Sequence, residues 1–363
     1  MTKVRTMKKI VCLIANLGSG GAERQLCNLA TLLSRDGYDV EVWCYQAENF
    51  YLPLLHEAGV KYRYIAEAND PKRRIWSIHK ALKAAAPDTV IAYLDTPSII
   101  ACISKLLGGR YRLIVSERNT TQRLTLRERI KFWLYGAARY IVPNSVSQGE
   151  YIRTNHRRLA PKLRVITNSL DTERFSPADS KCSDTFRLLG VGRVTPQKNL
   201  LRYIDAIAEL RRRGLSIEVR WVGNQADSEY MASCSERIAK HNLQDIFTFA
   251  TPTADIVCEY RNATAFCLPS IYEGYPNVLC EAMSCGLPVA CSRVCDNPYI
   301  AKEGVNGTLF DPYDINDIAD GIARLYDMCS SSYDRITKEN RQQIVANNSN
   351  EEFLARYKAL IEA

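Results

Sequence analysis

The stretch that decides the fold runs from Ala265 to Ala290 and reads AFCLPSIYEGYPNVLCEAMSCGLPVA. Its opening apolar run, which starts at residue 263, ends at Pro269 and predicts a buried strand. Pro276 and Asn277 are helix start signals, and the glycine and proline near the end of the stretch are stop signals. The stretch therefore predicts a strand–loop–helix unit, and open parallel sheets bind ligands beyond the carboxyl ends of such strands.

Two carboxylates lie in this unit, Glu273 in the loop and Glu281 on the helix. A carboxylate accepts two hydrogen bonds at fixed geometry, which suits the hydroxyl pair of a ribose or a hexose. Isolated carboxylates are mostly exposed, so a solvated loop glutamate beside an ordinary helix-surface glutamate is the alternative. The residues around the pair favour a ligand site.

The run E-G-Y-P-N-V-L-C-E-A-M-S-C-G-L-P-V, from Glu273 to Val289, resembles the signature of the retaining glycosyltransferases of family four, which have the GT-B fold. Those enzymes carry two glutamates separated by seven residues, typically as E-G-x-P-N-x-x-x-E-A-M followed by G-x-P-V. The resemblance implies that Glu273 contacts hydroxyls of the transferred sugar and that Glu281 contacts the ribose of the nucleotide. It assigns the remaining contacts to diphosphate and sugar to backbone groups of Tyr275, Pro276, Asn277 and Val278.

Length and charge agree with a two-domain protein that meets an anionic partner. The chain has 363 residues, 46% of them hydrophobic, which is enough for about two ordinary domains. Residues 1–175 contain 28 Lys+Arg against 15 Asp+Glu, whereas the remainder contains 20 against 25. A basic half indicates a phosphate-bearing substrate or an anionic membrane surface. No recognised nucleic-acid-binding motif accompanies the charge, so nucleic acid is not expected.

Apolar runs and cysteines indicate the compartment. No run approaches the ~20 apolar residues of a membrane-spanning helix, and Ile10–Leu17 has no cleavage site after it. The 13 cysteines form no CxxC pair and many lie within apolar patterns, as free thiols do in a reducing cytoplasm. We therefore expect a cytoplasmic protein, with peripheral attachment to the inner face of the cell membrane as a further hypothesis.

The first half of the chain alternates strands and helices, which predicts a parallel sheet with helices on both faces. Its first strand leads through Gly18-Ser19-Gly20-Gly21 into a helix. The resemblance places Gly20 and Gly21 near the donor phosphates and the acceptor, and a tight strand-to-helix turn is the alternative. As a dinucleotide fingerprint the loop is poor, because the third glycine and the acidic partner at the end of the next strand are missing.

Polar residues follow two other strands of this half, Asp95 after one and Glu117-Arg118-Asn119 after another. Both groups are expected at the carboxyl edge of the sheet, where they would line a cleft. A helix cap explains Asp95 equally well.

The helix predicted over residues 124–139 mixes cations with aromatic residues, as interfacial helices do. The favoured alternative buries the aromatic side chains in the core and leaves the arginines solvated. A second basic cluster at residues 153–164 supports an interfacial role for the whole domain. The mixed residues are Arg123, Arg127, Arg129, Lys131, Phe132, Trp133 and Tyr135.

A linker composition marks the middle of the chain. Residues 168–171 read NSLD and are followed by FSP and a polar stretch. The family has N-G-V-D at its interdomain crossing, so Ser169 replaces the usual glycine. The resemblance implies an α/β GT-B fold, two Rossmann-like domains facing a central cleft. We expect an acceptor-side domain over residues 1–168, a donor-binding domain over 169–346, and a C-terminal helix, 347–363, that packs back on the first.

Two cations open the second domain, Arg193 and Lys198, between a strand and a helix. An arginine offers a planar fork and a lysine a point charge, so the two can converge on one diphosphate. Two solvated cations are the alternative. The pair resembles the family's G-R-x-x-x-x-K-N/G element, which implies catalytic roles for Arg193, Lys198 and Glu273.

With the resemblance, the sequence predicts a retaining hexosyltransferase. It would move a hexose or N-acetylhexosamine from a nucleotide-sugar, foremost a UDP-sugar, to a glycan or lipid-linked acceptor in surface polysaccharide synthesis. No D-x-D motif is present, so no metal or other cofactor is expected and the two cations would neutralise the leaving diphosphate. The alternatives are a catalytically silent sugar-nucleotide-binding or membrane scaffold protein and, from the glycine loop, a nicotinamide-dependent oxidoreductase.

Overall fold

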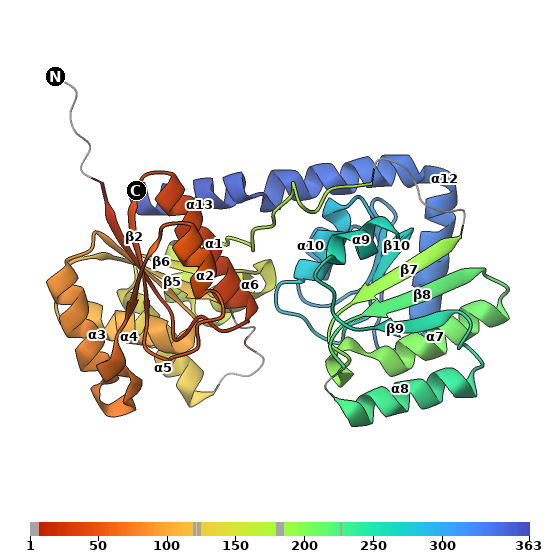
Figure 1. Cartoon of the computed structure of the whole chain (residues 1–363), viewed down its shortest axis with the longest axis horizontal. Coiled ribbons are helices and arrows are strands. Elements are labelled where there is room, and N and C mark those ends of the chain that lie inside the picture. Colours follow the sequence, from red (N-terminus) through yellow and green to blue (C-terminus); the bar gives the residue numbers. More distant parts are fainter. Residues whose placement is uncertain (1–6, 119–120, 122–124, 179–184, 226) are drawn as a thin grey trace, which may run out of the picture. The chain divides into compact units, whose positions relative to one another are not determined.

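The computed structural model describes residues 7–118, 121, 125–178, 185–225 and 227–363 (Figure 1). Its contacts divide the chain into two compact units. Unit 1 is Met1–Ser169 together with Asn350–Ala363, and unit 2 is Leu170–Ser349. The chain therefore leaves unit 1 once and returns to it for its last helix.

Unit 1 is built on a parallel sheet. Its strands are β1 (Lys9–Leu13), β2 (Asp39–Cys44), β3 (Lys61–Tyr64), β4 (Thr89–Tyr93), β5 (Arg112–Glu117) and β6 (Tyr140–Pro143). The strand order β3-β2-β1-β4-β5-β6 is that of a doubly wound fold. The central strands β1 and β4 are apolar after their first residues, Lys9 and Thr89, because helices cover both faces of the sheet.

Two helical layers cover this sheet, and each encloses its own hydrophobic core. One layer contains α3 (Pro71–Ala85), α4 (Asp95–Leu106), α5 (Leu126–Leu134) and α6 (Val146–Asn155). The other contains α1 (Gly21–Arg35), α2 (Leu52–Glu57) and α13 (Asn350–Glu362). Short 3-10 turns are η1 (Ala66–Asn69), η2 (Tyr135–Ala137) and η3 (Arg157–Lys162).

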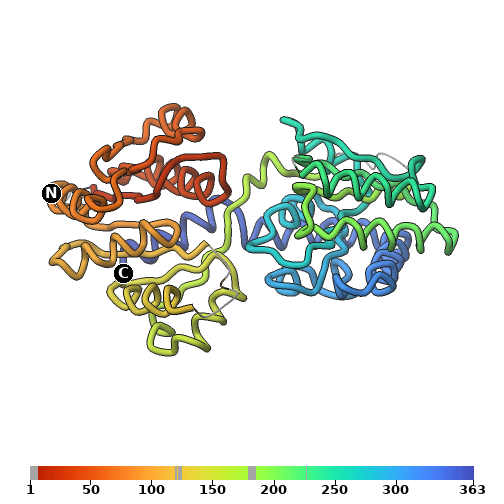
Figure 2. The backbone as a smooth tube through the Cα atoms, turned by 90° about the horizontal axis from the view of Figure 1, so that it is seen from below, coloured from red at the N-terminus to blue at the C-terminus, as the bar shows by residue number. Residues whose placement is uncertain are grey.

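The last helix, α13, completes the core of unit 1 although it ends the chain. Phe353 and Tyr357 are buried among residues of β1, β2 and α1, and the blue C-terminal segment lies beside the red and orange ones (Figure 2). The buried guanidinium of Arg118 donates to the hydroxyl groups of Tyr93 (2.5 Å) and Tyr357 (3.2 Å) and to Asn168 Oδ1 (2.6 Å). One side chain thus joins β4, β5, α13 and the segment that leaves the unit.

The segment that leaves unit 1 shows how Ser169 replaces a glycine. Its backbone does not adopt a positive φ, so no glycine is required there. The Ser169 amide donates to Gln25 Oε1 (2.9 Å), and its hydroxyl accepts from Asn28 Nδ2 (2.8 Å). The side chain therefore fastens the crossing to α1.

Unit 2 repeats the architecture. Its strands are β7 (Phe186–Val191), β8 (Ile217–Val222), β9 (Phe247–Ala250), β10 (Ala265–Leu268), β11 (Val289–Ser292) and β12 (Gly307–Phe310). They form a parallel sheet with the order β12-β11-β10-β7-β8-β9. Its helices are η4 (Pro196–Lys198), α7 (Leu200–Arg212), α8 (Ser228–Lys240), α9 (Ile256–Arg261), α10 (Asn277–Ser284), α11 (Asn297–Ile300) and α12 (Ile315–Asn348), the last kinked at Ser332.

We expect Tyr357→Phe to lower the free energy of unfolding by about 1–2 kcal/mol, because it removes a buried hydroxyl that accepts from a guanidinium. Urea unfolding followed by circular dichroism measures the change. Tyr38→Phe is the matched control, since it removes an exposed hydrogen bond to Glu362 on the same helix. Equal losses in both variants would contradict a special role for the buried network.

Candidate functional site

Two loops meet at the carboxyl edge of the unit 2 sheet, one after β7 and one after β10. The two strands are hydrogen-bonded neighbours. The Ile271 amide donates to the Gln197 carbonyl (2.9 Å), and Gln197 Nε2 donates to the Tyr272 carbonyl (2.9 Å). These bonds hold the loops side by side, so residues far apart in sequence form one site.

Asn199 anchors the first loop. It adopts a left-handed backbone conformation, with φ of 61°, which asparagine tolerates better than most residues. Its buried side-chain amide donates to the carbonyls of Pro269 (3.1 Å) and Pro312 (2.6 Å). The turn that carries Lys198 is therefore fixed against the loops after β10 and β12.

Lys198 and Glu273 form the centre of the site. Lys198 Nζ lies 2.6 Å from Glu273 Oε1, and both side chains are nearly buried. A Cβ on Gly192, which has φ of 155°, would lie 2.7 Å from Lys198 Cε. A Cβ on Gly223 would lie 1.9 Å from the Gly192 carbonyl oxygen. Gly192 thus leaves room for the lysine side chain, and Gly223 lets the backbone of the Gly192 turn approach closely.

Arg193 lies on the same loop, with its side chain exposed to solvent. No carboxylate pairs with it in the part of the chain that the structure describes, whereas Lys198 is paired. The site therefore presents one exposed cation and one held by a carboxylate, both at the carboxyl edge of the sheet.

Glu281 lies on α10 and is nearly buried. The hydroxyl of Tyr260, which comes from α9 and is fully buried, donates to Glu281 Oε2 (3.0 Å). Through that bond, the rigid Tyr260 side chain orients the Glu281 carboxylate. No pattern in the sequence marks Tyr260, because its partner lies on the next helix of the fold.

The start of α10 forms the third side of the site. The helix begins at Asn277, after Pro276, without a side-chain cap among the described residues. The Asn277 and Leu279 amides donate to the carbonyls of Tyr275 and Pro276 (both 3.0 Å), and the positive end of the helix dipole suits an anion. The Tyr275 hydroxyl accepts from Asn348 Nδ2 (2.6 Å), which makes that buried side chain structural. The Glu273 amide donates to Cys295 Sγ (3.4 Å), a support that the sequence does not reveal.

The predicted residues of unit 2 thus lie at one edge of its sheet, on the loops after β7 and β10 and on α10, whereas Gly20 and Gly21 belong to unit 1. They lie at the start of α1, and neither has a positive φ. A Cβ on Gly20 would lie 2.1 Å from Glu23 Oε2, whereas a Cβ on Gly21 would meet nothing within 4 Å. The backbone there does not itself require glycine, and the ligand role of the pair stays a prediction.

The carboxyl edge of the unit 1 sheet differs from the expectation. Glu117 is fully buried and does not line an open edge. It and two other carboxylates surround Lys131, with Nζ 3.2 Å from Glu117, 3.3 Å from Asp95 and 2.8 Å from Glu128. Asp95 makes no side-chain capping bond within the described residues, so its role is the ion pair. Arg118 is buried too, and Asn119 lies outside the described residues, as does Arg123.

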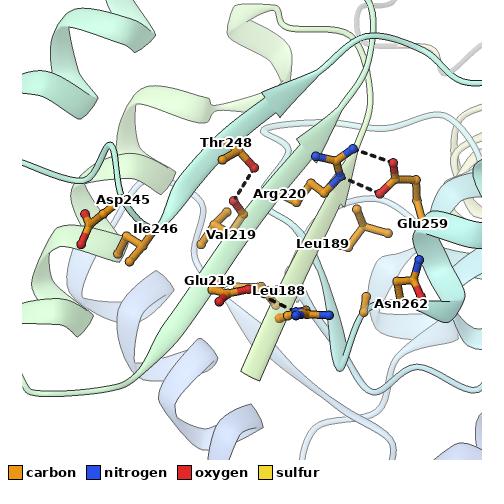
Figure 3. Close-up of a pocket in the computed structure, with 12 residues that line it drawn as sticks. Leu188, Leu189, Glu218, Val219, Arg220, Asp245, Ile246, Thr248, Glu259 and Asn262 are labelled. Carbon is orange, nitrogen blue, oxygen red and sulfur yellow. Dashed lines mark hydrogen bonds and ion pairs between the residues drawn. The ribbon is translucent and has the colours of Figure 1, made fainter. Parts of the chain in front are cut away.

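A cavity of about 530 Å³ in unit 2 lies away from these residues, over β7, β8 and β9 (Figure 3). Four of its charged side chains form two ion pairs, Arg220 with Glu259 (2.6 Å) and Arg187 with Glu218 (3.1 Å). None of the predicted site residues lines it. It is therefore not the candidate site.

The described residues contain neither a metal-binding cluster nor a membrane-spanning helix. No group of three or more His, Cys, Asp or Glu side chains there is arranged to hold a metal ion. None of the helices within those ranges has the length and apolar character needed to cross a membrane.

Two family models match adjoining parts of the chain. The model described as glycosyl transferases group 1 matches residues 171–343, and Glycosyltransferase Family 4 matches residues 19–174. The fold is that of solved GT-B glycosyltransferases, which confirms the predicted α/β fold class. The Anabaena protein Alr3699/HepE, solved in complex with UDP, superposes with a TM-score of 0.85 and 19% identity over 98% of this chain and 100% of that one. The chain is therefore a glycosyltransferase with the GT-B fold.

Particular relatives act in bacterial glycan synthesis. The amylovoran biosynthesis glycosyltransferase AmsD of Erwinia amylovora is 26% identical over 78% of this chain and 80% of its own. The UDP-Gal:alpha-D-GlcNAc-diphosphoundecaprenol alpha-1,3-galactosyltransferase of Escherichia coli is 25% identical over 85% of each chain.

We expect Glu117→Gln to flatten the dependence of stability on pH. Burial raises the pKa of Glu117 to about 7, against the opposing charge of Lys131. Because its folded pKa lies above its unfolded value, Glu117 stabilises the fold below about pH 4.5 and loses that contribution as pH rises through 7. Wild-type unfolding free energy should fall by roughly 1–3 kcal/mol more than that of the variant across this window, as measured by urea titration. Parallel curves would contradict the assignment.

Proposed function

We propose that this chain is a retaining glycosyltransferase that moves a hexose or N-acetylhexosamine from a UDP-sugar to a lipid-linked or glycan acceptor in surface polysaccharide synthesis. The observation that carries the proposal is the Lys198–Glu273 pair, which lies at the carboxyl edge of the sheet beside the start of α10. The donor and acceptor classes are supported by the UDP complex of the Anabaena protein and by the name of the Escherichia coli relative.

The diphosphate of the donor would lie between the two cations and the positive end of α10. The exposed side chain of Arg193 would supply a planar guanidinium group. Lys198 would supply an ammonium group that Glu273 already holds in place. Both charges are present before the substrate arrives, so little reorganisation is needed as negative charge grows on the leaving group. We propose that these groups act without a metal ion.

Each of the two glutamates would bind the hydroxyl groups of a different sugar ring of the donor. Glu273 lies beside Lys198, so its carboxylate contacts hydroxyls of the transferred sugar next to the diphosphate. Glu281, oriented by Tyr260, accepts hydrogen bonds from the ribose.

Retention is proposed through displacement on one face of the sugar. The bond between the anomeric carbon and the phosphate oxygen breaks, and the acceptor oxygen bonds to the same face of that carbon. The acceptor proton passes to the departing phosphate oxygen. Within this scheme Glu273 orients the sugar and forms no bond to it.

We further propose that the protein is cytoplasmic and attaches peripherally to the inner face of the cell membrane. A lipid-linked acceptor lies at that surface, and the cationic half of the chain is suited to anionic headgroups.

We expect Glu281→Ala to weaken UDP binding about tenfold or more, since the ribose loses two hydrogen bonds. Glu273→Ala should weaken it less, because this carboxylate is proposed to contact the sugar, which UDP lacks. Tyr260→Phe should give an intermediate loss, because Glu281 keeps its charge and loses its orienting donor. Thermal stabilisation by UDP, with GDP, ADP, CMP and NAD as comparisons, measures these effects. Equal losses in both glutamate variants would overturn the division of roles, and stabilisation by NAD alone would favour an oxidoreductase.

We expect Lys198→Ala to lower kcat by about 10²- to 10³-fold while the fold stays intact, because charge on the leaving diphosphate is no longer neutralised. The assay follows UDP release from a panel of UDP-sugars with a diphosphopolyprenol-linked sugar as acceptor. Lys240→Ala, an exposed lysine of the same unit, is the control. Donor binding without turnover in the wild type would favour a silent scaffold, and an inverted anomeric configuration in the product would exclude retention.

A further inference from the structure

Two tryptophans of unit 1 lie on the surface, although tryptophan is a large apolar residue. The chain has four, of which Trp43 and Trp221 are fully buried, whereas Trp76 and Trp133 are each 60% exposed. The indole ring joins a wide apolar body to one N–H group, a combination suited to the boundary between water and lipid. Their surroundings show what each ring is placed to meet.

Trp76 lies on the outer face of α3. Trp76, Lys80 and Lys83 follow one another at intervals of four and three residues and so share that face, while Ile78 and Leu82 are buried on the other. The helix contains five basic residues and no acidic one. Among the described residues, no carboxylate forms an ion pair with Lys80 or Lys83. The outer face of α3 therefore carries an exposed tryptophan beside two lysines that no carboxylate of the described residues neutralises.

Trp133 lies on α5 in the same kind of setting. Leu126, Ile130 and Trp133 have the same spacing and are between 51% and 74% exposed, so α5 carries an apolar stripe that the core does not use. Arg127 and Arg129 flank the stripe and are exposed. The predicted alternative, in which the core takes the aromatic side chains, holds for Phe132 and Tyr135 but is wrong for Trp133.

The two helices belong to one layer of unit 1. Both contact α4, and the inner sides of all three helices enclose the same core (Figure 1). Their outer sides therefore belong to one side of the unit. We call this surface the tryptophan face and define it by Trp76, Lys80 and Lys83 on α3 and Ile130, Trp133 and Arg129 on α5.

We propose that the tryptophan face docks unit 1 on an anionic phospholipid bilayer. The indole rings and Ile130 would enter the boundary between headgroups and acyl chains, and the lysines and Arg129 would contact lipid phosphates. Charge complementarity selects this occupant, because exposed cations that lack carboxylate partners suit a surface with uniform negative charge. The inference rests on the proposed function, to which it adds the surface that brings unit 1 to a lipid-linked acceptor.

The tryptophans supply their own assay. Vesicles of phosphatidylglycerol with brominated acyl chains quench a tryptophan that enters them, and Trp43 and Trp221 are shielded by burial. We expect the wild type to be quenched by these vesicles, less so at about 0.5 M salt, and only weakly by brominated phosphatidylcholine. Cosedimentation of the same vesicles measures the affinity without tryptophan.

The matched variants are W76S/W133S and F50S. Phe50 is 65% exposed in the same unit and adjoins Tyr51, which packs into the opposite layer. The tryptophan double variant should bind phosphatidylglycerol vesicles at least tenfold more weakly, and K80Q/K83Q/R129Q should do the same, whereas F50S should bind like the wild type. Equal binding by W76S/W133S and the wild type would overturn the proposal, as would equal binding of the wild type to neutral vesicles.

The donor assay separates this inference from the proposed function. Thermal stabilisation by UDP needs no membrane and should be unchanged in W76S/W133S. If the wild type is stabilised by UDP but does not bind vesicles, the tryptophan face is not a lipid surface and the proposed function stands. If it binds vesicles through the face but no nucleotide stabilises it, the proposed function fails and the docking surface stands.

Discussion

The ion pair between Lys198 and Glu273 depends on most of the architecture of unit 2. Its partners are 75 residues apart in sequence and lie 2.6 Å from each other. They meet because β7 and β10 are adjacent in a parallel sheet, so that both following loops leave the same edge. Nearly buried charges are unfavourable when unpaired, which makes each partner a condition for placing the other. The turn held by Asn199 and the space left by Gly192 serve the same contact.

The same edge also explains where the other donor groups lie. Helix α10 follows β10 and therefore begins at this edge, which brings the start of the helix and Glu281 to the candidate site. Electrostatic stabilisation of a leaving diphosphate requires charges that are already fixed, and rigid neighbours provide this better than mobile loops do. Tyr260 and Cys295 are such neighbours, since each supports a glutamate from a different element.

Helix α5 of unit 1 shows how one short element serves two purposes. Lys131 points inward, where three carboxylates neutralise it and fasten the helix to the sheet. Arg127, Arg129 and Trp133 point outward, where nothing in the described fold requires them. A basic helix in the sequence therefore contains two classes of cation. Only burial distinguishes the cation that builds the core from those that face solvent.

The sequence by itself determined the fold class and named most residues of the candidate site in unit 2. Strand and helix periodicity, together with the run from Glu273 to Val289, identify parallel α/β units and a strand–loop–helix motif, because local patterns record local structure. The tertiary structure decided which distant residues meet: Lys198 with Glu273, Tyr260 with Glu281, and α13 with the core of unit 1. The structure also shows that Glu117, which was expected at an open sheet edge, lies in a buried cluster, and that Trp133 is exposed. Such contacts depend on strand order and on helix rotation about its axis, and no single segment of sequence specifies either.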